Sequence, residues 1–224
     1  MFGSCFGSHW AGLPVEDRGS SHLKADRFVI VSTNLGWFGL VGSPSGVKAV
    51  TGPESDQDDV RAEITNGFAD AREIAHGSDS GIDGLAQDLA GYAVGKKTEL
   101  SAPLDIDDGT AFQQSVWLAL REIPNGEVRS YGQIAAAIGK PGSARAVGQA
   151  VGANPLTIVV PCHRVVGSDG ALTGFGGGLE VKEKLLIHEG RADAAAQRIR
   201  TEQRKNFRRT RRELGLRRGV KAAS

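Results

Sequence analysis

The sequence contains little cysteine and no long apolar segment. Its two cysteines, Cys5 and Cys162, are too few for a disulfide framework and lie far apart in the chain. The first residues have neither the basic start nor the apolar run of a signal peptide. No segment approaches the ~20 apolar residues that span a bilayer. We therefore expect no membrane contact and an intracellular, reducing setting, cytoplasmic or, in a eukaryote, nuclear, in which a thiol stays free.

The net charge of +1 hides a strong asymmetry along the 224 residues. Residues 41–110 carry 5 Lys/Arg against 14 Asp/Glu, whereas residues 191–224 carry 12 Lys/Arg against 3 Asp/Glu. Charge blocks of this kind often mark interaction tails. The basic tail, 191–224, is expected to stay solvated and disordered, to contact nucleic acid, or to fold against the acidic segment.

The N-terminal half predicts a small α/β domain over 27–103, preceded by a flexible Gly/Ser-rich stretch, 1–26. Short β-branched and apolar runs separated by turn compositions indicate strands in an antiparallel meander. Two later segments have apolar residues at helical spacing and acidic outer faces. The expected strands cover 27–33, 36–42 and 46–50, and the expected helices cover 58–76 and 82–96.

The C-terminal half, 104–190, predicts a helical domain. Thr110 and Gln113 form a capping-box pattern that opens a helix whose buried face runs from Phe112 to Ile123. Two short helices then flank a glycine-containing turn, which is the helix-turn-helix pattern, and Ser143 is placed to cap the second of them. These helices are expected at 131–138 and 144–152, a glycine-rich wing loop at 167–178, and a last helix at 181–189.

Cys162 stands in the sequence Pro-Cys-His-Arg, beside His163 and Arg164. A cysteine reacts through its thiolate, which a neighbouring imidazole or cation favours. A Cys-His pair alone is a weak indication, because adjacent side chains need not point the same way and most intracellular cysteines are inert core residues.

The context of the pair is more specific. Asn154 to Val166 reads NPLTIVVPCHRVV, follows the helix-turn-helix with its Arg-Ala-Val-Gly at 145–148, and precedes Leu-Ile-His-Glu-Gly at 186–190. These segments closely resemble the O6-alkylguanine-DNA alkyltransferases over about 109–190, and 27–50 resembles that family more loosely. The resemblance implies an α/β fold with an RNase H-like N-terminal domain and a winged helix-turn-helix domain that carries the reactive cysteine.

The resemblance also implies a reaction: irreversible, single-turnover transfer of an alkyl group from guanine O6 in DNA to Cys162. His163 would take the thiol proton through a bound water, and Glu189 would orient His163. Asn154 would organise the turn that carries the cysteine. The carbonyls of Cys162 and Val165 would accept the exocyclic amine of the base.

DNA would be engaged from the recognition helix and the wing. Arg145 would fill the space of the flipped base, with Ser143, Ala144 and Ala146 beside it, and Tyr131 would promote nucleotide rotation and donate to guanine N3. The main-chain N–H of Gly176 would reach O6. The substrate pocket is expected to comprise Tyr131, Val151, Val165, Phe175 and Gly176, although Phe175 and Gly176 depart from the family pattern of tyrosine and serine and leave the substrate range open.

The expected partner is double-stranded DNA containing O6-alkylguanine, with O4-alkylthymine open, and the protein is expected to be a monomer without metal or cofactor. Cys5, His9, His22 and His76 do not have zinc-site spacing. Three alternative functions compete with this one: a non-catalytic protein that binds alkyl lesions, an alkylation-sensing transcription regulator, and a cysteine hydrolase. The presence of Cys162 disfavours the first, and the single N-terminal cysteine disfavours the second.

Overall fold

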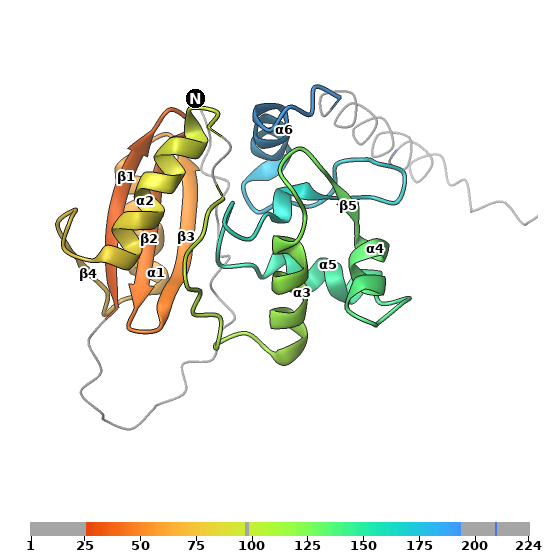
Figure 1. The fold of residues 1–224 in the computed structure, drawn as a ribbon, viewed down its shortest axis with the longest axis horizontal. Coiled ribbons are helices and arrows are strands. Elements are labelled where there is room, and N and C mark those ends of the chain that lie inside the picture. The colour runs from red at the N-terminus through yellow and green to blue at the C-terminus, as the bar shows by residue number, and fades with distance from the viewer. Residues whose placement is uncertain (1–25, 97–98, 194–208, 210–224) are drawn as a thin grey trace, which may run out of the picture.

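The computed structural model describes residues 26–96, 99–193 and Arg209, and the fold is mixed α/β (Figure 1). A sheet with two helices occupies the N-terminal half, and a group of helices with one short two-stranded sheet occupies the C-terminal half. In this described part of the chain, no helix is both long and apolar enough to cross a membrane. The predictions for residues 1–25, for Cys5, His9 and His22, and for nearly all of the tail beyond Asp193 lie outside the described residues.

The N-terminal sheet has the strand order β3-β2-β1-β4. Strands β1 (Arg27–Thr33), β2 (Gly36–Ser43) and β3 (Gly46–Glu54) form an antiparallel meander, which confirms the sequence prediction. The short strand β4 (Arg72–Glu73) was not predicted and adds to β1 in parallel.

One helix covers each face of this sheet. Helix α1 (Gln57–Gly67) places Val60 and Ile64 against one face, where Phe28 is buried. Helix α2 (Ser80–Ala93) packs on the other face, and its apolar residues belong to a core that continues into the C-terminal half. The alternation of strand side chains between the two faces produces this two-sided core.

The predicted helix 58–76 was too long, because the observed α1 ends at Gly67. The terminating sequence Asn66-Gly67 has poor helix propensity. Phe68 leaves the helical conformation and packs its ring against the α1 side of the sheet. The chain then turns into β4, and Asp79 caps α2 by accepting from the N–H groups of Gly81 and Ile82.

The C-terminal half follows the predicted order of helices. Helix α3 (Ala111–Arg121) begins with both hydrogen bonds of the Thr110–Gln113 capping box, as predicted. Helices α4 (Tyr131–Ala137) and α5 (Ala144–Gly152) pack against each other and against α3. Strands β5 (Arg129–Ser130) and β6 (Val165–Val166) pair in parallel, and α6 (Gly178–His188) closes the half.

Two details of the C-terminal prediction were wrong. Ser143 holds the N-cap position of α5 but makes no capping bond; its hydroxyl donates instead to the Lys140 carbonyl at 2.6 Å. Helix α6 begins at Gly178 rather than Val181, because the glycine turn at 174–178 leads directly into it. Of the 167–178 stretch expected as a wing, residues 167–177 form turns and irregular backbone, and Gly178 is the first residue of α6.

The two halves share hydrogen bonds as well as a core. Val50 of β3 donates to the Pro155 carbonyl at 2.9 Å and accepts from the Thr157 N–H at 3.1 Å. The loop that leads to Cys162 is therefore paired with the edge of the N-terminal sheet. The boundary at 103/104, and the RNase H-like and winged-helix assignments, stay predictions.

Candidate active site

Cys162 begins a short 3₁₀ turn, Cys162–Arg164, and is only 8% exposed. It lines a cavity of about 180 Å³ that lies between the two halves of the chain. A larger groove of about 770 Å³ passes along Tyr92 and Arg164 but has no cysteine among its lining residues, so the smaller cavity is the candidate site. Its walls include Tyr131, Val151, Asn154, Cys162, Phe175 and Gly176.

The loop before Cys162 is held by Asn154, which is 5% exposed. The Asn154 amide donates to the Val160 carbonyl at 2.8 Å, and its oxygen accepts from the Leu156 N–H at 3.0 Å. Ile158, within this loop, has φ of 69°, a left-handed conformation that disfavours a β-branched residue. The buried Ile158 side chain and the Asn154 bonds hold the backbone in this conformation, which costs on the order of 1–3 kcal/mol.

The Cys162 thiol is neutral in this state. Burial raises its pKa, while the hydrogen bond from Asn154 and the charge of Lys182 act in the opposite direction. A buried thiol becomes a strong nucleophile only when a base removes its proton. The site therefore needs a nearby proton acceptor.

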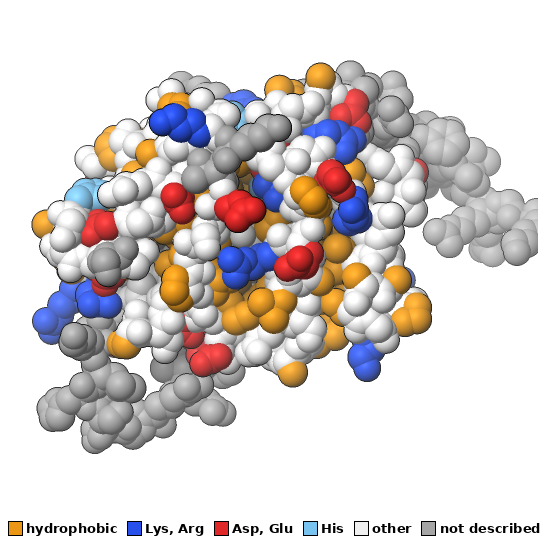
Figure 2. Space-filling model, viewed as in Figure 1, with side chains coloured by type: hydrophobic (Ala, Val, Ile, Leu, Met, Phe, Trp, Pro, Cys, Tyr) orange, Lys and Arg blue, Asp and Glu red, His pale blue; other side chains and the backbone are white. Residues whose placement is uncertain are grey.

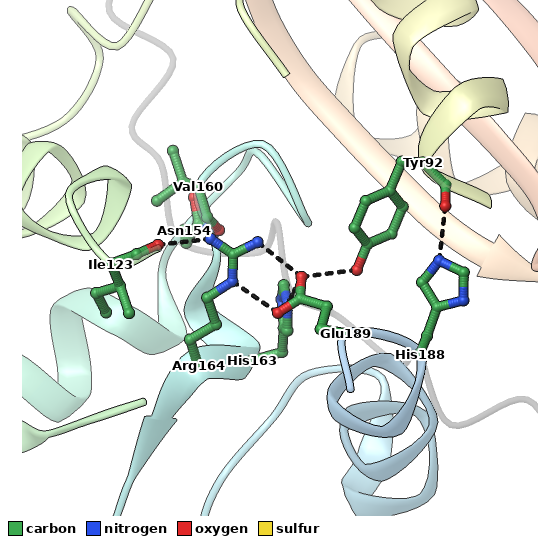
Figure 3. Close-up of polar contacts among 8 residues, drawn as sticks. All are labelled: Tyr92, Ile123, Asn154, Val160, His163, Arg164, His188 and Glu189. Atoms are coloured by element: carbon green, nitrogen blue, oxygen red, sulfur yellow. Dashed lines mark hydrogen bonds and ion pairs between the residues drawn. The ribbon is translucent and has the colours of Figure 1, made fainter. Parts of the chain in front are cut away.

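His163 has the features of that acceptor. Its Nε2 lies 3.0 Å from Oε1 of Glu189, and both side chains are fully buried (Figure 3). Burial lowers the pKa of His163, and Glu189 only partly opposes this effect, so the ring is neutral. Because an ionised carboxylate only accepts, Nε2 carries the proton and Nδ1 is the free basic nitrogen. Nδ1 is buried and has no hydrogen-bond partner among the described residues.

Glu189 is held by more groups than the sequence indicated. Arg164 donates from Nε to Oε2 at 2.9 Å and from Nη2 to Oε1 at 2.7 Å, and Tyr92 donates its hydroxyl to Oε1 at 2.9 Å (Figure 3). Burial alone would raise the pKa of Glu189, but the bonds from His163 and Arg164 hold it well below its usual range. Glu189 is therefore an anion that can stabilise a protonated His163.

Lys182 of α6 is a second residue that sequence reasoning missed. It is fully buried and donates to the carbonyls of Val165 and Thr173. Burial lowers its pKa to about 8, a shift that an ionised Cys162 would oppose. The sequence did contain an indication that Lys182 is buried, because helical spacing places it on the same face of α6 as the buried Leu185 and Leu186.

Replacing Lys182 with Met is expected to remove a pH dependence of stability. The ordinary pKa of 10.5 falls to about 8 in the folded state, so between these values the unfolded state binds more protons. The contribution of Lys182 to the free energy of unfolding is therefore most favourable above pH 10.5 and is lost as the pH falls through 8. The free energy of unfolding differs by about 3 kcal/mol between these two limits. Urea unfolding of the protein with Lys182 and of the Lys182→Met variant from pH 7 to 10.5 measures this change in the free energy of unfolding. Because Lys182 also lowers the pKa of Cys162, both proteins carry Cys162→Ser in this comparison. A difference in free energy of unfolding that stays constant with pH would contradict the assignment.

Tyr131, the first residue of α4, joins the cavity to the helix-turn-helix. Its ring lies over Gly148 of α5, where an added Cβ would stand 3.7 Å from the ring. Its hydroxyl donates to the Thr173 carbonyl at 3.4 Å and accepts from the Thr173 hydroxyl at 3.3 Å. The ring therefore lies between α5 and the glycine-rich loop, facing the cavity that contains Cys162.

Arg145 lies on the exposed side of α5, while Val147, Ala150 and Val151 face the core. Within the described part of the chain it makes no hydrogen bond or ion pair, so its guanidinium is available to a ligand. Ala144 and Ala146 on either side are small and half-buried, as is Ser143. This arrangement leaves one long cation projecting from the start of the helix.

The face that carries α2 and α3 has a different character. Figure 2 shows acidic and basic side chains intermingled on it. Among the described residues on that face there is no continuous positive field of the kind that attracts a polyanion. The start of α5 is therefore the stronger candidate for contact with DNA.

The remaining predicted residues divide into two groups. Val151, Phe175 and Gly176 line the cavity with Cys162. Val165 is fully buried in β6, and its carbonyl already accepts from Lys182, so a bound base would have to share that oxygen. The Cys162 carbonyl likewise accepts from the Val165 N–H.

The N-terminal half supplies part of the cavity wall, which the sequence did not indicate. Val50 and Thr51 of β3 and Glu63 of α1 line it, and the Thr51 hydroxyl donates to Glu63. No spacing rule connects these positions to residue 162, and only the pairing of β3 with the cysteine loop brings them there. Among the described residues no group of three His, Cys, Asp or Glu side chains is placed to hold a metal.

The chain is similar to known proteins. Residues 111–191 match the family model described as 6-O-methylguanine DNA methyltransferase, DNA binding domain. A methylated-DNA–protein-cysteine methyltransferase of Salmonella typhimurium is 55% identical over 107 residues, which are 48% of this chain and 63% of that protein. The methylated-DNA–protein-cysteine methyltransferase of Mycolicibacterium paratuberculosis is 54% identical over 113 residues, which are 50% of this chain and 68% of that protein. The matched segment thus spans slightly less than two thirds of the Salmonella protein.

Two solved structures from Mycobacterium tuberculosis cover more of the chain. The O6-methylguanine methyltransferase is 41% identical, with a TM-score of 0.59, over 75% of this chain and 94% of that one. OGT in complex with DNA is 39% identical, with a TM-score of 0.60, over 76% of this chain and 98% of that one. The similarity therefore includes the N-terminal sheet as well as the helical half.

Proposed function

The chain belongs to the O6-methylguanine DNA methyltransferase family, and from that premise we propose that it repairs DNA by moving an alkyl group from guanine O6 onto its own Cys162. The observation that carries the proposal is the position of Cys162 in the wall of a cavity, directly followed by a neutral His163 that is hydrogen-bonded to an ionised Glu189. This is the order of nucleophile, base and orienting acid that activates a weakly acidic nucleophile.

The proposed step is one displacement at carbon. The thiol proton passes to Nδ1 of His163, directly or through a water, and the thiolate attacks the alkyl carbon. A carbon–sulfur bond forms as the carbon–O6 bond breaks, and the electron pair leaves with the guanine. Donors near the base, with Tyr131 and the Gly176 N–H as candidates, would stabilise that charge. The step requires neither metal nor cofactor, and the thioether product leaves Cys162 unable to react again.

The alkyl carbon of a paired base is inaccessible, so the proposal includes rotation of the nucleotide out of the duplex. Unstacking costs a few kcal/mol, and a planar guanidinium can occupy the vacated space. Arg145 is exposed at the start of α5, and Tyr131 connects that helix to the cavity. We accordingly propose double-stranded DNA containing O6-alkylguanine as the partner, a monomeric protein, and an intracellular location.

The decisive experiment is transfer of mass to the protein. The full chain is incubated with a duplex containing one O6-methylguanine, digested, and analysed by peptide mass spectrometry. The proposal requires one added methyl group on the peptide that contains Cys162 and unmodified guanine in the DNA. Binding to the lesion duplex without any added mass would instead identify a non-catalytic lesion-binding protein.

The basic tail carries a separate prediction for DNA affinity. Residues 191–224 hold 12 Lys/Arg against 3 Asp/Glu, and each phosphate neutralised contributes a slope of about −0.9 in log K against log salt. If about four cations engage, truncation at Arg191 should flatten the slope by roughly 3 to 4 units and leave lesion preference unchanged. A salt series with full-length and truncated protein measures this. Tighter DNA binding after truncation would show that the tail folds on the acidic segment, and an identical slope would exclude it from DNA binding.

A further inference from the structure

Tyr92 connects the N-terminal half of the chain to the reactive pair. It is the penultimate residue of α2, it is 2% exposed, and its hydroxyl donates to Oε1 of Glu189 at 2.9 Å. Tyr92 lies outside the residues 111–191 that match the DNA-binding domain. A residue of the N-terminal half therefore contacts the acid that orients His163 (Figure 3).

The two oxygens of Glu189 are used unequally. Oε1 accepts from His163, from Arg164 and from Tyr92, whereas the hydrogen bond described for Oε2 comes from Arg164 alone. Arg164 is also tied to the Ile123 carbonyl at 2.6 Å, so it cannot follow the carboxylate freely. Tyr92 thus holds the particular oxygen that His163 uses.

Tyr92 acts as a neutral donor. Burial raises the pKa of its hydroxyl, and the negative charge of Glu189 raises it further, so the group stays protonated at any working pH. A donor on Oε1 withdraws negative charge from the oxygen that faces His163. Removing this donor leaves Oε1 a stronger acceptor, which favours the protonated form of His163 before substrate has bound.

We propose that Tyr92 is a positioning residue for alkyl transfer, which sets the orientation and basicity of the Glu189–His163 pair from the N-terminal half of the chain. This inference rests on the proposed function of the site. Its consequence is that the pair stays ready to accept the thiol proton at neutral pH only while α2 is docked against α6.

Several charged and titratable groups surround the pair. Besides Glu189, the charges of Arg164 and of Lys182 of α6 act on His163, and both lower its pKa. None of these changes when Tyr92 becomes phenylalanine, which keeps the ring and loses only the hydroxyl. A change in the pH profile of the Tyr92→Phe variant would therefore report on the lost hydrogen bond.

His188 provides a matched control. Its Nε2 contacts the Tyr92 carbonyl at 2.6 Å, and its ring meets the Tyr92 ring edge-on at a centroid distance of 4.9 Å. His188→Phe keeps a ring at this junction and removes the backbone tether without removing the donor to Glu189. The two variants weaken the same interface, but only Tyr92→Phe alters the carboxylate.

The experiment measures single-turnover transfer from free O6-benzylguanine between about pH 5 and 9 by the full-length wild type and both variants, with thermal unfolding at the same pH values. In the Tyr92→Phe variant, the acidic limb of the pH–rate profile is expected to shift to higher pH by roughly one unit. This is the scale of one charge-assisted hydrogen bond. His188→Phe is expected to lower Tm and to leave the limb in place. Profiles of both variants that superimpose on the wild type would overturn the proposal.

A second readout separates this inference from the proposed function. Titration of the His163 ring protons by NMR should show a higher pKa in Tyr92→Phe than in wild type, whether or not any alkyl group is transferred. If the wild type transfers nothing, the proposed function fails while the NMR titration still decides the role of Tyr92. Equal His163 titration curves in the two proteins would reject that role.

Discussion

Cys162→Ser is expected to reduce transfer of a methyl group from O6-methylguanine in duplex DNA to an undetectable level. A serine hydroxyl is far less acidic than a thiol, and His163, whose pKa burial lowers, is too weak a base to ionise it. The substitution replaces sulfur by oxygen in a site that is 8% exposed, so the loop and its Asn154 bonds should persist. Transfer is measured as radiolabel from methylated duplex to protein.

The same assay tests stoichiometry. Among the described residues Cys162 is the one free cysteine, so no second thiol is placed to relieve it of the alkyl group. Wild-type repair should stop at one lesion per protein molecule, whatever the excess of DNA. Cys162→Ser should still bind the lesion duplex, which separates loss of chemistry from loss of fold. Continued turnover by the wild type, or label on the serine variant, would falsify the assignment of Cys162 as acceptor.

Arg145→Ala is expected to slow repair of duplex DNA by on the order of 100-fold, while changing the reaction with free O6-benzylguanine by less than about twofold. The difference arises because the free base needs no extrusion, whereas a flipped nucleotide loses the guanidinium that fills its place, at a cost of about 3 kcal/mol. Arg145 is exposed and makes no internal hydrogen bond within the described residues, so its removal should leave the fold intact.

The matched control for Arg145 is Lys140, an exposed cation in the turn that precedes α5. Lys140→Ala removes the same charge from the same surface without removing the side chain that would enter the stack. We expect a small, salt-dependent loss of duplex binding for this variant and little change in the transfer rate at saturation. Equal losses for the two variants would assign Arg145 to phosphate contact alone. An equal loss of Arg145→Ala on both substrates would contradict a role in base extrusion, because the free base has no phosphate and is not flipped out of a duplex.

Local sequence rules performed well where the structure depends on neighbours in the chain. The Thr110–Gln113 capping box, the three-strand meander and the helix-turn-helix spacing were all predicted from short segments. An equally readable capping box, Ser130 with Gln133, opens α4 and was not predicted. Where a local rule failed, at Ser143 and after Gly67, a nearby backbone carbonyl or a packed aromatic ring offered a competing interaction.

The sequence by itself determined the chemistry that the protein can carry: a thiol beside an imidazole, an acid at the end of the last helix, and one long cation at the start of α5. Those residues are distinguished by motif and spacing, which are properties of the linear chain. The tertiary structure alone decided which other groups set the pKa values and the orientation of these side chains. Tyr92 reaches Glu189 across 97 positions, the charge of the buried Lys182 acts to lower the pKa of the thiol, and Val50 pairs with the cysteine loop. A hydrogen bond depends on direction and on distances near about 3 Å, and only the packing of α2, α6 and β3 around one shared core brings such distant residues into that range.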